Sequence, residues 1–245
     1  MKIASFRMSK LGNKESDYED ALSYDLDRLK FAIADGASDS IFSDIWAEAL
    51  TETFVQGPYD LFWEPDKSLM NRIAKEAREK WYRRINWASL PWFIRNKGVN
   101  GSFSTILLVQ FRETSTNFLL LRAMAIGDSC IFKINGDKIL WSFPVKSIRE
   151  FGTSPQLVWS GKGYPLPLDS PAKLPTPKIF EDIIHIDEKV VIATDSASSL
   201  IFREKNIPAL LDSVSRDEFK QRIVAAIDSG VIRNDDVTMA VVAFK

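Results

Sequence analysis

Histidine is nearly absent from this sequence, and its scarcity removes several common kinds of catalytic site. His185 is the only histidine among 245 residues, so a three-histidine zinc site cannot form. A serine–histidine–aspartate triad would have to use His185, and no G-x-S-x-G turn is present to carry the serine. His185 lies in the strand-like run Ile183–Ile186, where a packing or surface role is expected. The sequence therefore argues against histidine-dependent hydrolysis.

Cysteine is equally scarce, and glycine-rich phosphate loops are missing. Cys130 is the only cysteine, so no internal disulfide can form, which fits a reducing compartment. We predict that it is a small apolar strand residue. A cysteine phosphatase would need an arginine in the loop after its cysteine, where this chain has Asn135 and Gly136. Neither G-x-x-x-x-G-K-[ST] nor G-x-G-x-x-G occurs, which argues against nucleotide-driven chemistry.

Net charge and long apolar runs are lacking as well. The formal charge is -1, which gives no bulk attraction to nucleic acid or to an anionic membrane. No run approaches the roughly 18 apolar residues of a membrane span, and the first residues lack the apolar core of a secretory signal. We therefore expect a soluble, cytoplasmic monomer that binds neither nucleic acid nor membrane.

What the chain does contain is enough apolar sequence for one large domain. Its hydrophobic content is 45% over 245 residues, which suffices for a substantial core. Short runs rich in β-branched and aromatic residues predict strands at Thr105–Phe111, Asn117–Ile126, Cys130–Ile134 and Lys138–Trp141. Asn135-Gly136 predicts a tight hairpin turn between the last two. Consecutive hairpins predict a largely antiparallel sheet.

Helical patterns lie on both sides of the predicted strands. Ser68–Ile85 carries apolar residues at helical spacing and charges of both signs on its other faces. The mixed charge favours a solvated face over a nucleic-acid patch. Further helices are expected at about 41–55, 197–202 and 217–229. We expect Trp87–Gly101, which separates the helical and strand patterns, to be an irregular linker.

Proline is concentrated in one segment. Seven prolines lie between Phe143 and Lys178, so regular elements cannot extend far there. A loop region of this length inside a compact domain is usually a lid, a recognition surface or a mobile segment. We predict a flap at about 143–178 beside the site, within a single domain that spans 1–245.

Aspartates end several of the apolar runs. Asp35 ends the first such run and is followed by Gly36, which allows close approach of the backbone to a ligand. Asp128, Asp195 and Asp235 end other runs in the same way, without a glycine after them. Carboxylates with carbonyl help suit Mg²⁺ or Mn²⁺, and two such ions about 3.5–4 Å apart can deprotonate a bridging water and neutralise a phosphoryl oxygen. The sequence therefore predicts metal-assisted hydrolysis without histidine or cysteine.

Six short motifs occur in order along nearly the whole chain: Tyr18-Glu19-Asp20-Ala21, Ala34-Asp35-Gly36-Ala37, Gly101-Ser102-Phe103-Ser104-Thr105, Ile126-Gly127-Asp128-Ser129, Ala193-Thr194-Asp195-Ser196 and Asn234-Asp235-Asp236-Val237-Thr238. This ordered set resembles the metal-dependent Ser/Thr protein phosphatases of type 2C. The resemblance implies an α+β fold, a four-layer α-β-β-α sandwich of two mainly antiparallel sheets flanked by helices. It also implies two divalent cations, Mg²⁺ or Mn²⁺, in the channel between the sheets.

The resemblance assigns roles to the matching residues. Asp35 would bridge both ions and Gly36 would lend its carbonyl, while Glu19 and Asp20 would bind directly or through metal waters. Asp128 matches the acid of a weaker third ion. The implied metal ligands are Glu19, Asp20, Asp35, Gly36, Asp128, Asp195 and Asp235, and the implied catalytic residues are Asp35, Asp195 and Asp235.

The sequence departs from the family pattern at the substrate position. Glu15 stands where the family has a phosphate-binding arginine, so a carboxylate replaces a guanidinium fork. Lys14 and Arg7 are the candidates to bind the substrate phosphate instead. Ala37-Ser38 replaces a frequent His-Gly pair, which removes a possible proton donor, and Ser196 replaces a glycine, a mild change.

The resemblance implies a phosphoprotein phosphatase that hydrolyses phosphoserine and phosphothreonine monoesters with a metal-bound water. A phosphorylated protein would be its substrate. Two alternatives stay open at this point. One is a catalytically weak or inactive relative that binds a phosphoprotein or another partner through the flap and the helix at 68–85. The other is hydrolysis of a small phosphorylated metabolite or nucleotide.

Overall fold

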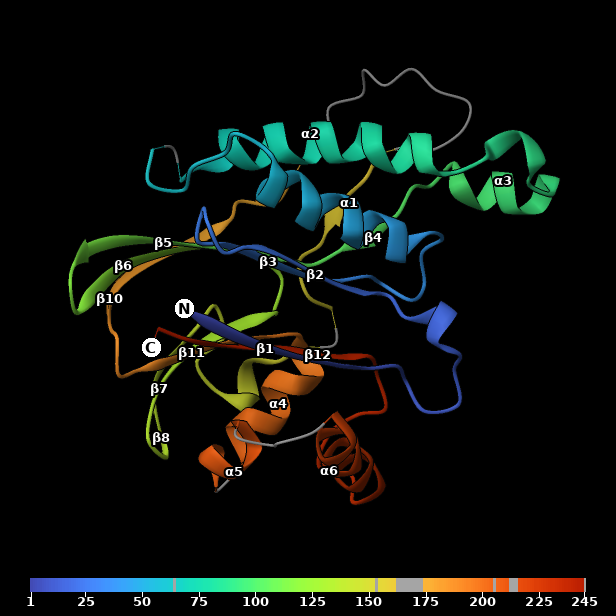
Figure 1. Ribbon diagram of the computed structural model, residues 1–245. Helices are drawn as coiled ribbons and strands as arrows, with labels where there is room; N and C mark the ends of the chain where they lie inside the picture. The colour runs from blue at the N-terminus through green and yellow to red at the C-terminus, as the bar shows by residue number, and fades with distance from the viewer. Residues whose placement is uncertain (64, 153, 162–173, 205, 212–215, 245) are drawn as a thin grey trace.

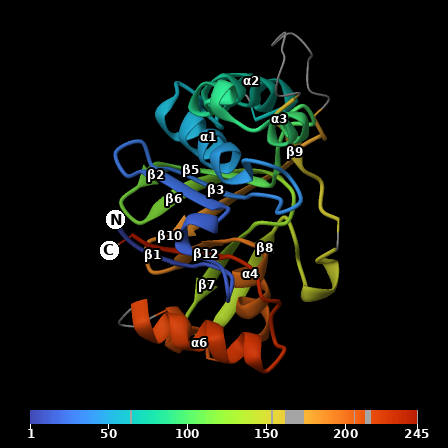
Figure 2. The same cartoon turned by 90° about the vertical axis from the view of Figure 1, so that its right-hand side faces the viewer.

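The computed structural model describes residues 1–245 except 64, 153, 162–173, 205, 212–215 and 245. Two five-stranded antiparallel sheets lie face to face, and helices cover the outer side of each (Figures 1 and 2). This confirms the four-layer sandwich expected from the sequence. Among the described residues, no helix combines the length and apolar character needed to cross a bilayer.

The first sheet has the strand order β10-β6-β5-β3-β2. Its strands are β2 (Asp20–Asp25), β3 (Lys30–Asp35), β5 (Ile106–Ser115), β6 (Phe118–Ile126) and β10 (Lys178–His185). Helices α1 (Ser43–Gln56) and α2 (Lys67–Arg84) pack on its outer face. Trp46 and Trp81 are fully buried in this layer. The helix predicted at 68–85 is thus confirmed, with its apolar stripe against α1.

The second sheet has the order β1-β12-β11-β7-β8. Its strands are β1 (Lys2–Met8), β7 (Cys130–Asn135), β8 (Lys138–Phe143), β11 (Lys189–Ala193) and β12 (Val237–Ala243). Helices α4 (Asp195–Arg203), α5 (Ile207–Leu211) and α6 (Arg216–Asp228) lie on its outer face. Cys130 is a free, buried residue of this sheet, as predicted.

Strand β3 shows why its sequence is apolar without alternation. Ala32 and Ala34 face the helix layer, whereas Phe31 and Ile33 face the opposite sheet, because successive side chains point to opposite faces. All four are fully buried, and each large side chain contributes roughly 1.5–3 kcal/mol on burial. The strand is therefore fixed on both faces up to its last residue, Asp35.

His185 lies at the opposite end of the sandwich from Asp35. It pairs with Phe118 at the start of β6, whereas Ile126 at the end of β6 is aligned with Ile106 near Asp35. A strand of this length spans roughly 25 Å. The ring contacts Phe118 and lies 3.3 Å from the Asp187 carboxylate. The expected packing or surface role of His185 is thus confirmed.

The prediction of an irregular linker at 87–101 was wrong. This stretch holds a 3-10 helix, η2 (Trp87–Ser89), and helix α3 (Trp92–Gly98). Pro91 precedes the first turn of α3, where a missing backbone N–H costs nothing. Two short helical pieces do not extend far enough to reveal a period in the sequence.

The proline-rich segment contains only short elements in its described part. These are η3 (Ile148–Glu150) and β9 (Val158–Trp159), and β9 pairs with β4 (Phe103–Ser104). The Val158 carbonyl accepts a 2.9 Å hydrogen bond from Trp46 Nε1, which ties β9 to the core. Residues 162–173 of the predicted flap lie outside the described residues. The flap and the single-domain boundaries stay predictions.

Candidate active site

The predicted acids meet where strands of the two sheets end. Asp35 closes β3 directly opposite Asp20 at the start of β2. Asp195 follows β11 and begins α4, Asp235 lies just before β12, and Asp128 lies in the turn between β6 and β7. These five residues are called the acid cluster below. The antiparallel pairing of both sheets brings all five to one end of the sandwich.

Burial and mutual repulsion characterise the acid cluster. Burial raises the pKa of Asp35 well above its usual range, and the charges of Asp20, Asp195, Asp235 and Asp128 raise it further. Burial likewise raises the pKa of Asp20, of Asp195 and of Asp128, the last to about 7. Each carboxylate thus disfavours ionisation of its neighbours. Positive charge placed among them would be strongly favoured.

Asp20 has one satisfied and one unsatisfied oxygen. Its Oδ2 accepts hydrogen bonds from the hydroxyls of Thr194, at 3.0 Å, and Thr238, at 2.6 Å. Its Oδ1 is buried and has no hydrogen-bond partner among the described residues. A buried acceptor without a partner is costly in free energy. The two threonines therefore hold a carboxylate whose second oxygen is left for a ligand.

Gly36 occupies a position that no other residue fits. A Cβ there would lie 2.7 Å from the Glu19 carbonyl oxygen and 2.9 Å from the backbone carbon of Ser43. Its N–H donates to the same Glu19 carbonyl at 3.2 Å. The close contact draws the start of β2, the end of β3 and the start of α1 together. It accounts for the Asp-Gly sequence, while the role of the Gly36 carbonyl stays a prediction.

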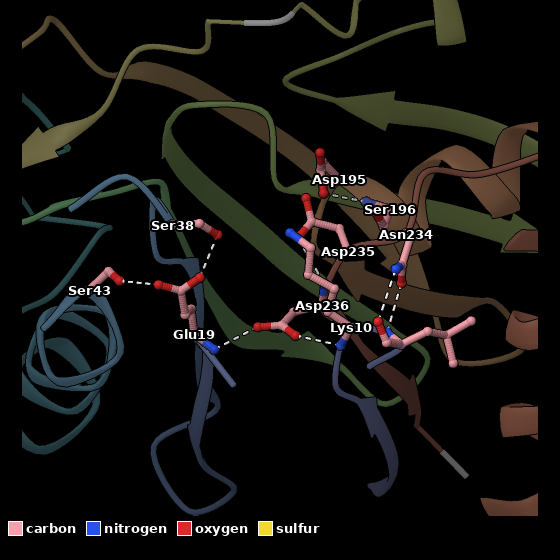
Figure 3. A network of polar contacts seen from close by, with 10 residues as sticks. Lys10, Glu19, Ser38, Ser43, Asp195, Ser196, Asn234, Asp235 and Asp236 are labelled. Carbon is pink, nitrogen blue, oxygen red and sulfur yellow. Dashed lines mark hydrogen bonds and ion pairs between the residues drawn. The ribbon is translucent and has the colours of Figure 1, made fainter. Parts of the chain in front are cut away.

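The Glu19 carboxylate points away from the acid cluster. It accepts hydrogen bonds from Ser38 and Ser43, both at 2.5 Å, and Figure 3 shows it directed away from Asp195 and Asp235. The Glu19 backbone N–H donates to Asp236 at 2.7 Å. The structure therefore brings Glu19 beside the cluster through its backbone and holds its side chain among serines.

Two cations near the acid cluster, Lys10 and Arg233, were not predicted from the sequence. Lys10 Nζ lies 3.4 Å from Asp235 Oδ1, and its backbone N–H donates to Asp236 at 2.8 Å (Figure 3). Burial and the charge of Asp235 raise the pKa of Asp195, and the charge of Arg233 partly opposes that rise. Arg233 is next to the Asn234-Asp235 motif, so its place near the site could have been predicted from the sequence. The place of Lys10 could not, because Lys10 and Asp235 are 225 residues apart in the chain.

The residues predicted to bind phosphate lie outside the cluster. Arg7 lies over the ring of Tyr18, 5.7 Å from its centroid. It lines a cavity of about 350 Å³ between β1 and β2 that extends to Asp20. Lys14 is exposed, and its backbone N–H donates to Asp17. In the described contacts neither side chain meets a predicted metal ligand, so their roles stay predictions.

The oxygen atoms of the acid cluster suit hard divalent cations, although their side chains do not yet surround a single point. In the described parts of the chain, no three acidic, histidine or cysteine side chains are gathered to hold an ion as they stand. Five repelling carboxylates, the unpartnered Asp20 oxygen and the close approach at Gly36 nonetheless match oxygen-ligated Mg²⁺ or Mn²⁺.

Solved structures match this chain along its whole length. The photosystem II phosphatase PBCP is 16% identical with a TM-score of 0.62, covering 100% of this chain and 98% of its own. The fold is that of the type 2C phosphatases. The catalytic domain of the serine/threonine phosphatase PstP, in complex with two manganese ions, is 15% identical with a TM-score of 0.59, covering 98% and 96%.

Stp1 from Staphylococcus aureus has the type 2C fold as well. It is 12% identical with a TM-score of 0.60, covering 100% of this chain and 95% of its own. Neither a protein-family model nor a curated protein matches the sequence. Identities this low establish the fold, so the function has to be argued from the residues at the site.

Proposed function

We propose that this chain is a metal-dependent protein phosphatase that hydrolyses phosphoserine and phosphothreonine monoesters. The observation that carries the proposal is the acid cluster at the strand ends of a type 2C fold. Asp20 and Asp128 are buried and Asp35, Asp195 and Asp235 are partly buried, and the five carboxylates repel one another and lack enough protein cations to neutralise them. A structural role would pair these acids, whereas here Asp20 retains an unpartnered buried oxygen.

The cluster would hold two divalent cations, Mg²⁺ or Mn²⁺. Asp35, Asp195 and Asp235 would be the central ligands, with Asp20 and the Gly36 carbonyl beside them. Glu19 would join them if its carboxylate turned away from Ser38 and Ser43, and Asp128 would hold a weaker third ion. Such ions supply Lewis acidity, which lowers the pKa of a coordinated water and neutralises phosphoryl oxygens. The two manganese ions of PstP support this assignment.

Lys10 provides a positive charge for the substrate at the edge of the cluster. Its ammonium lies 3.4 Å from Asp235, and the hydrogen bond from its backbone to Asp236 fixes the position of its Cα. A lysine binds phosphate as a point charge rather than as a bidentate fork. We assign the phosphate role to Lys10 ahead of Lys14 and Arg7, which remain the candidates predicted from the sequence.

Turnover of p-nitrophenyl phosphate with and without Mn²⁺ tests the proposal, together with calorimetric titration of Mn²⁺. We expect hydrolysis that depends on the metal and two Mn²⁺ sites, both lost in Asp35→Asn. Metal binding without turnover of any phosphomonoester would contradict the proposal and leave a binding protein. Turnover confined to small phosphate esters, with phosphopeptides untouched, would contradict the assignment of protein substrates.

A further inference from the structure

Helix α3 presents aromatic side chains to solvent. Trp92 is 69% exposed and Phe93 is 51% exposed, and their rings meet edge to face with centroids 6.1 Å apart. Tryptophan and phenylalanine are enriched in interfaces between proteins, and adjacent exposed apolar side chains mark interaction sites. Single exposed apolar residues are common on protein surfaces, whereas two adjacent exposed aromatic rings indicate an interaction site.

Helix α3 also carries positive charges that no acidic residue of the helix neutralises. Residues 80–100 contain five Lys or Arg and no Asp or Glu. The three on α2 are paired with glutamates, whereas Arg95 and Lys97 form no ion pair within the described part of the chain. Trp92, Phe93, Arg95 and Lys97 are called the α3 surface below. It combines apolar area with two free cations.

Close packing of Gly98 on Trp87 holds the α3 surface in place. Gly98 packs so closely on Trp87 that a Cβ would lie 2.4 Å from the indole ring. Trp87 stacks on Tyr82 with centroids 5.5 Å apart and donates from Nε1 to the Tyr82 carbonyl at 3.0 Å. A surface held rigid before binding loses little conformational entropy when a partner docks.

Helix α3 lies at the end of the molecule where β3 ends and β12 begins (Figures 1 and 2), which is where the acid cluster lies. Six residues lead from Gly98 to Ser104, a path of at most about 20 Å. Ser104 Oγ donates to the Asp35 carbonyl at 2.8 Å, and the neighbouring Phe103 carbonyl accepts from Ala37 at 2.9 Å. An extended peptide with one residue at the cluster reaches α3 within about six residues.

We propose that the α3 surface binds the segment next to the phosphorylated residue of a substrate protein and selects acidic segments that contain an apolar side chain. The inference rests on the proposed function. Arg95 and Lys97 match acidic side chains, and the two aromatic rings match an apolar one. Two uncompensated cations are few for a nucleic-acid backbone, and the net charge of -1 gives no general attraction to anionic membranes.

Two phosphoserine peptides test the inference, one with glutamates and a leucine beside the phosphoserine and one with lysines instead. The variants are Trp92→Ala/Phe93→Ala and Arg95→Glu/Lys97→Glu. We expect each variant to lower kcat/KM for the acidic peptide roughly fivefold or more relative to p-nitrophenyl phosphate, mainly through KM. Charge reversal should raise kcat/KM for the lysine peptide.

Matched controls carry the same changes elsewhere. Trp63 is 84% exposed on the connection before α2, and Trp63→Ala should leave the peptide ratio unchanged. Lys2→Glu/Lys138→Glu reverses two exposed charges on β1 and β8 and should also leave it unchanged. An equal loss in this charge control would show a general electrostatic effect and would overturn the assignment to α3.

Binding without metal separates this inference from the proposed function. Fluorescence anisotropy of the labelled acidic peptide in EDTA reports docking even if no ester is hydrolysed. Equal affinity of wild type and Arg95→Glu/Lys97→Glu would overturn the inference whatever the activity. Sedimentation with phosphatidylserine vesicles is the third measurement, and strong binding that the α3 variants lose would make the surface a membrane contact instead.

Discussion

Aspartates held by hydrogen bonds and aspartates that repel one another respond in opposite ways to the same substitution. Asp182 accepts hydrogen bonds from Trp141 Nε1 at 2.6 Å and Lys133 Nζ at 3.1 Å. Burial works against ionisation, but these bonds lower the pKa of Asp182. Asp35 has charged neighbours of its own sign, and its pKa is raised. The contrast provides a test of what the acid cluster is for.

Asp35→Asn should leave the metal-free protein as stable as wild type, or more stable by about 1 kcal/mol, because a repulsive charge is removed. Asp182→Asn is the control and should destabilise by about 1 kcal/mol because it weakens hydrogen bonds. Thermal melts in EDTA and in Mn²⁺ measure both effects. Mn²⁺ should raise the Tm of wild type and of Asp182→Asn while barely moving Asp35→Asn. Equal metal shifts in all three proteins would contradict the site.

Lys10→Met tests the cation beside Asp235. Loss of a charged donor to phosphate should raise KM for phosphopeptides about tenfold, while Mn²⁺ binds more tightly because Asp235 loses its ion pair. Lys10→Arg should restore most of KM, and Lys14→Met is the control that should change neither quantity. Steady-state kinetics and Mn²⁺ calorimetry measure the two effects. If Lys14→Met raises KM and Lys10→Met does not, Lys14 binds the phosphate, as predicted from the sequence.

At the scale of elements, α3 depends on one close contact. Gly98→Ala places a methyl group 2.4 Å from the Trp87 ring, so α3 must shift, at a cost of about 1–3 kcal/mol. Gly152→Ala is the control, since its nearest neighbour would be 3.8 Å away. Urea unfolding measures the difference in stability. If both variants unfold at the same urea concentration, α3 is not held by this contact.

Elements with a continuous pattern were predictable from the sequence, and contacts between distant elements were not. β3 and its terminal Asp35 could be predicted because the strand is buried on both faces. α3 escaped prediction because one seven-residue helix shows no reliable period. The meeting of Lys10 with Asp235 escaped it because the contact depends on β1 pairing with β12, which no local pattern specifies.

At the scale of the whole molecule, the acid cluster makes stability depend on pH. The raised pKa values of Asp20, Asp35, Asp128 and Asp195 mean that the folded state binds protons more tightly than the unfolded state. The metal-free protein should therefore gain roughly 1–3 kcal/mol as pH falls from about 8 to about 5.5. This gain ends near pH 4, where unfolded carboxyls also bind protons.

Divalent cations should reverse this dependence, because protons compete with metal for the same carboxylates. Chemical unfolding at pH 8 and pH 5.5, in EDTA and in Mn²⁺, measures both slopes. Asp35→Asn should have the shallower slope in EDTA, and Asp182→Asn should keep the wild-type slope. Slopes of the same sign with and without Mn²⁺ would show that the cluster does not exchange protons for metal.

The pairing of β1 with β12 has a consequence for how the protein is made. Every strand of the first sheet has been synthesised by His185, whereas the one strand that pairs with β1 in the described structure is β12, which ends at Ala243. During translation β1 must therefore wait unpaired until β12 has been made, and closing so long a loop slows folding. Lys10, Asp235 and Asp236 come together in that same late step. A nascent chain would thus assemble one half of the sandwich early and bring these residues at the acid cluster together only after β12 has been made.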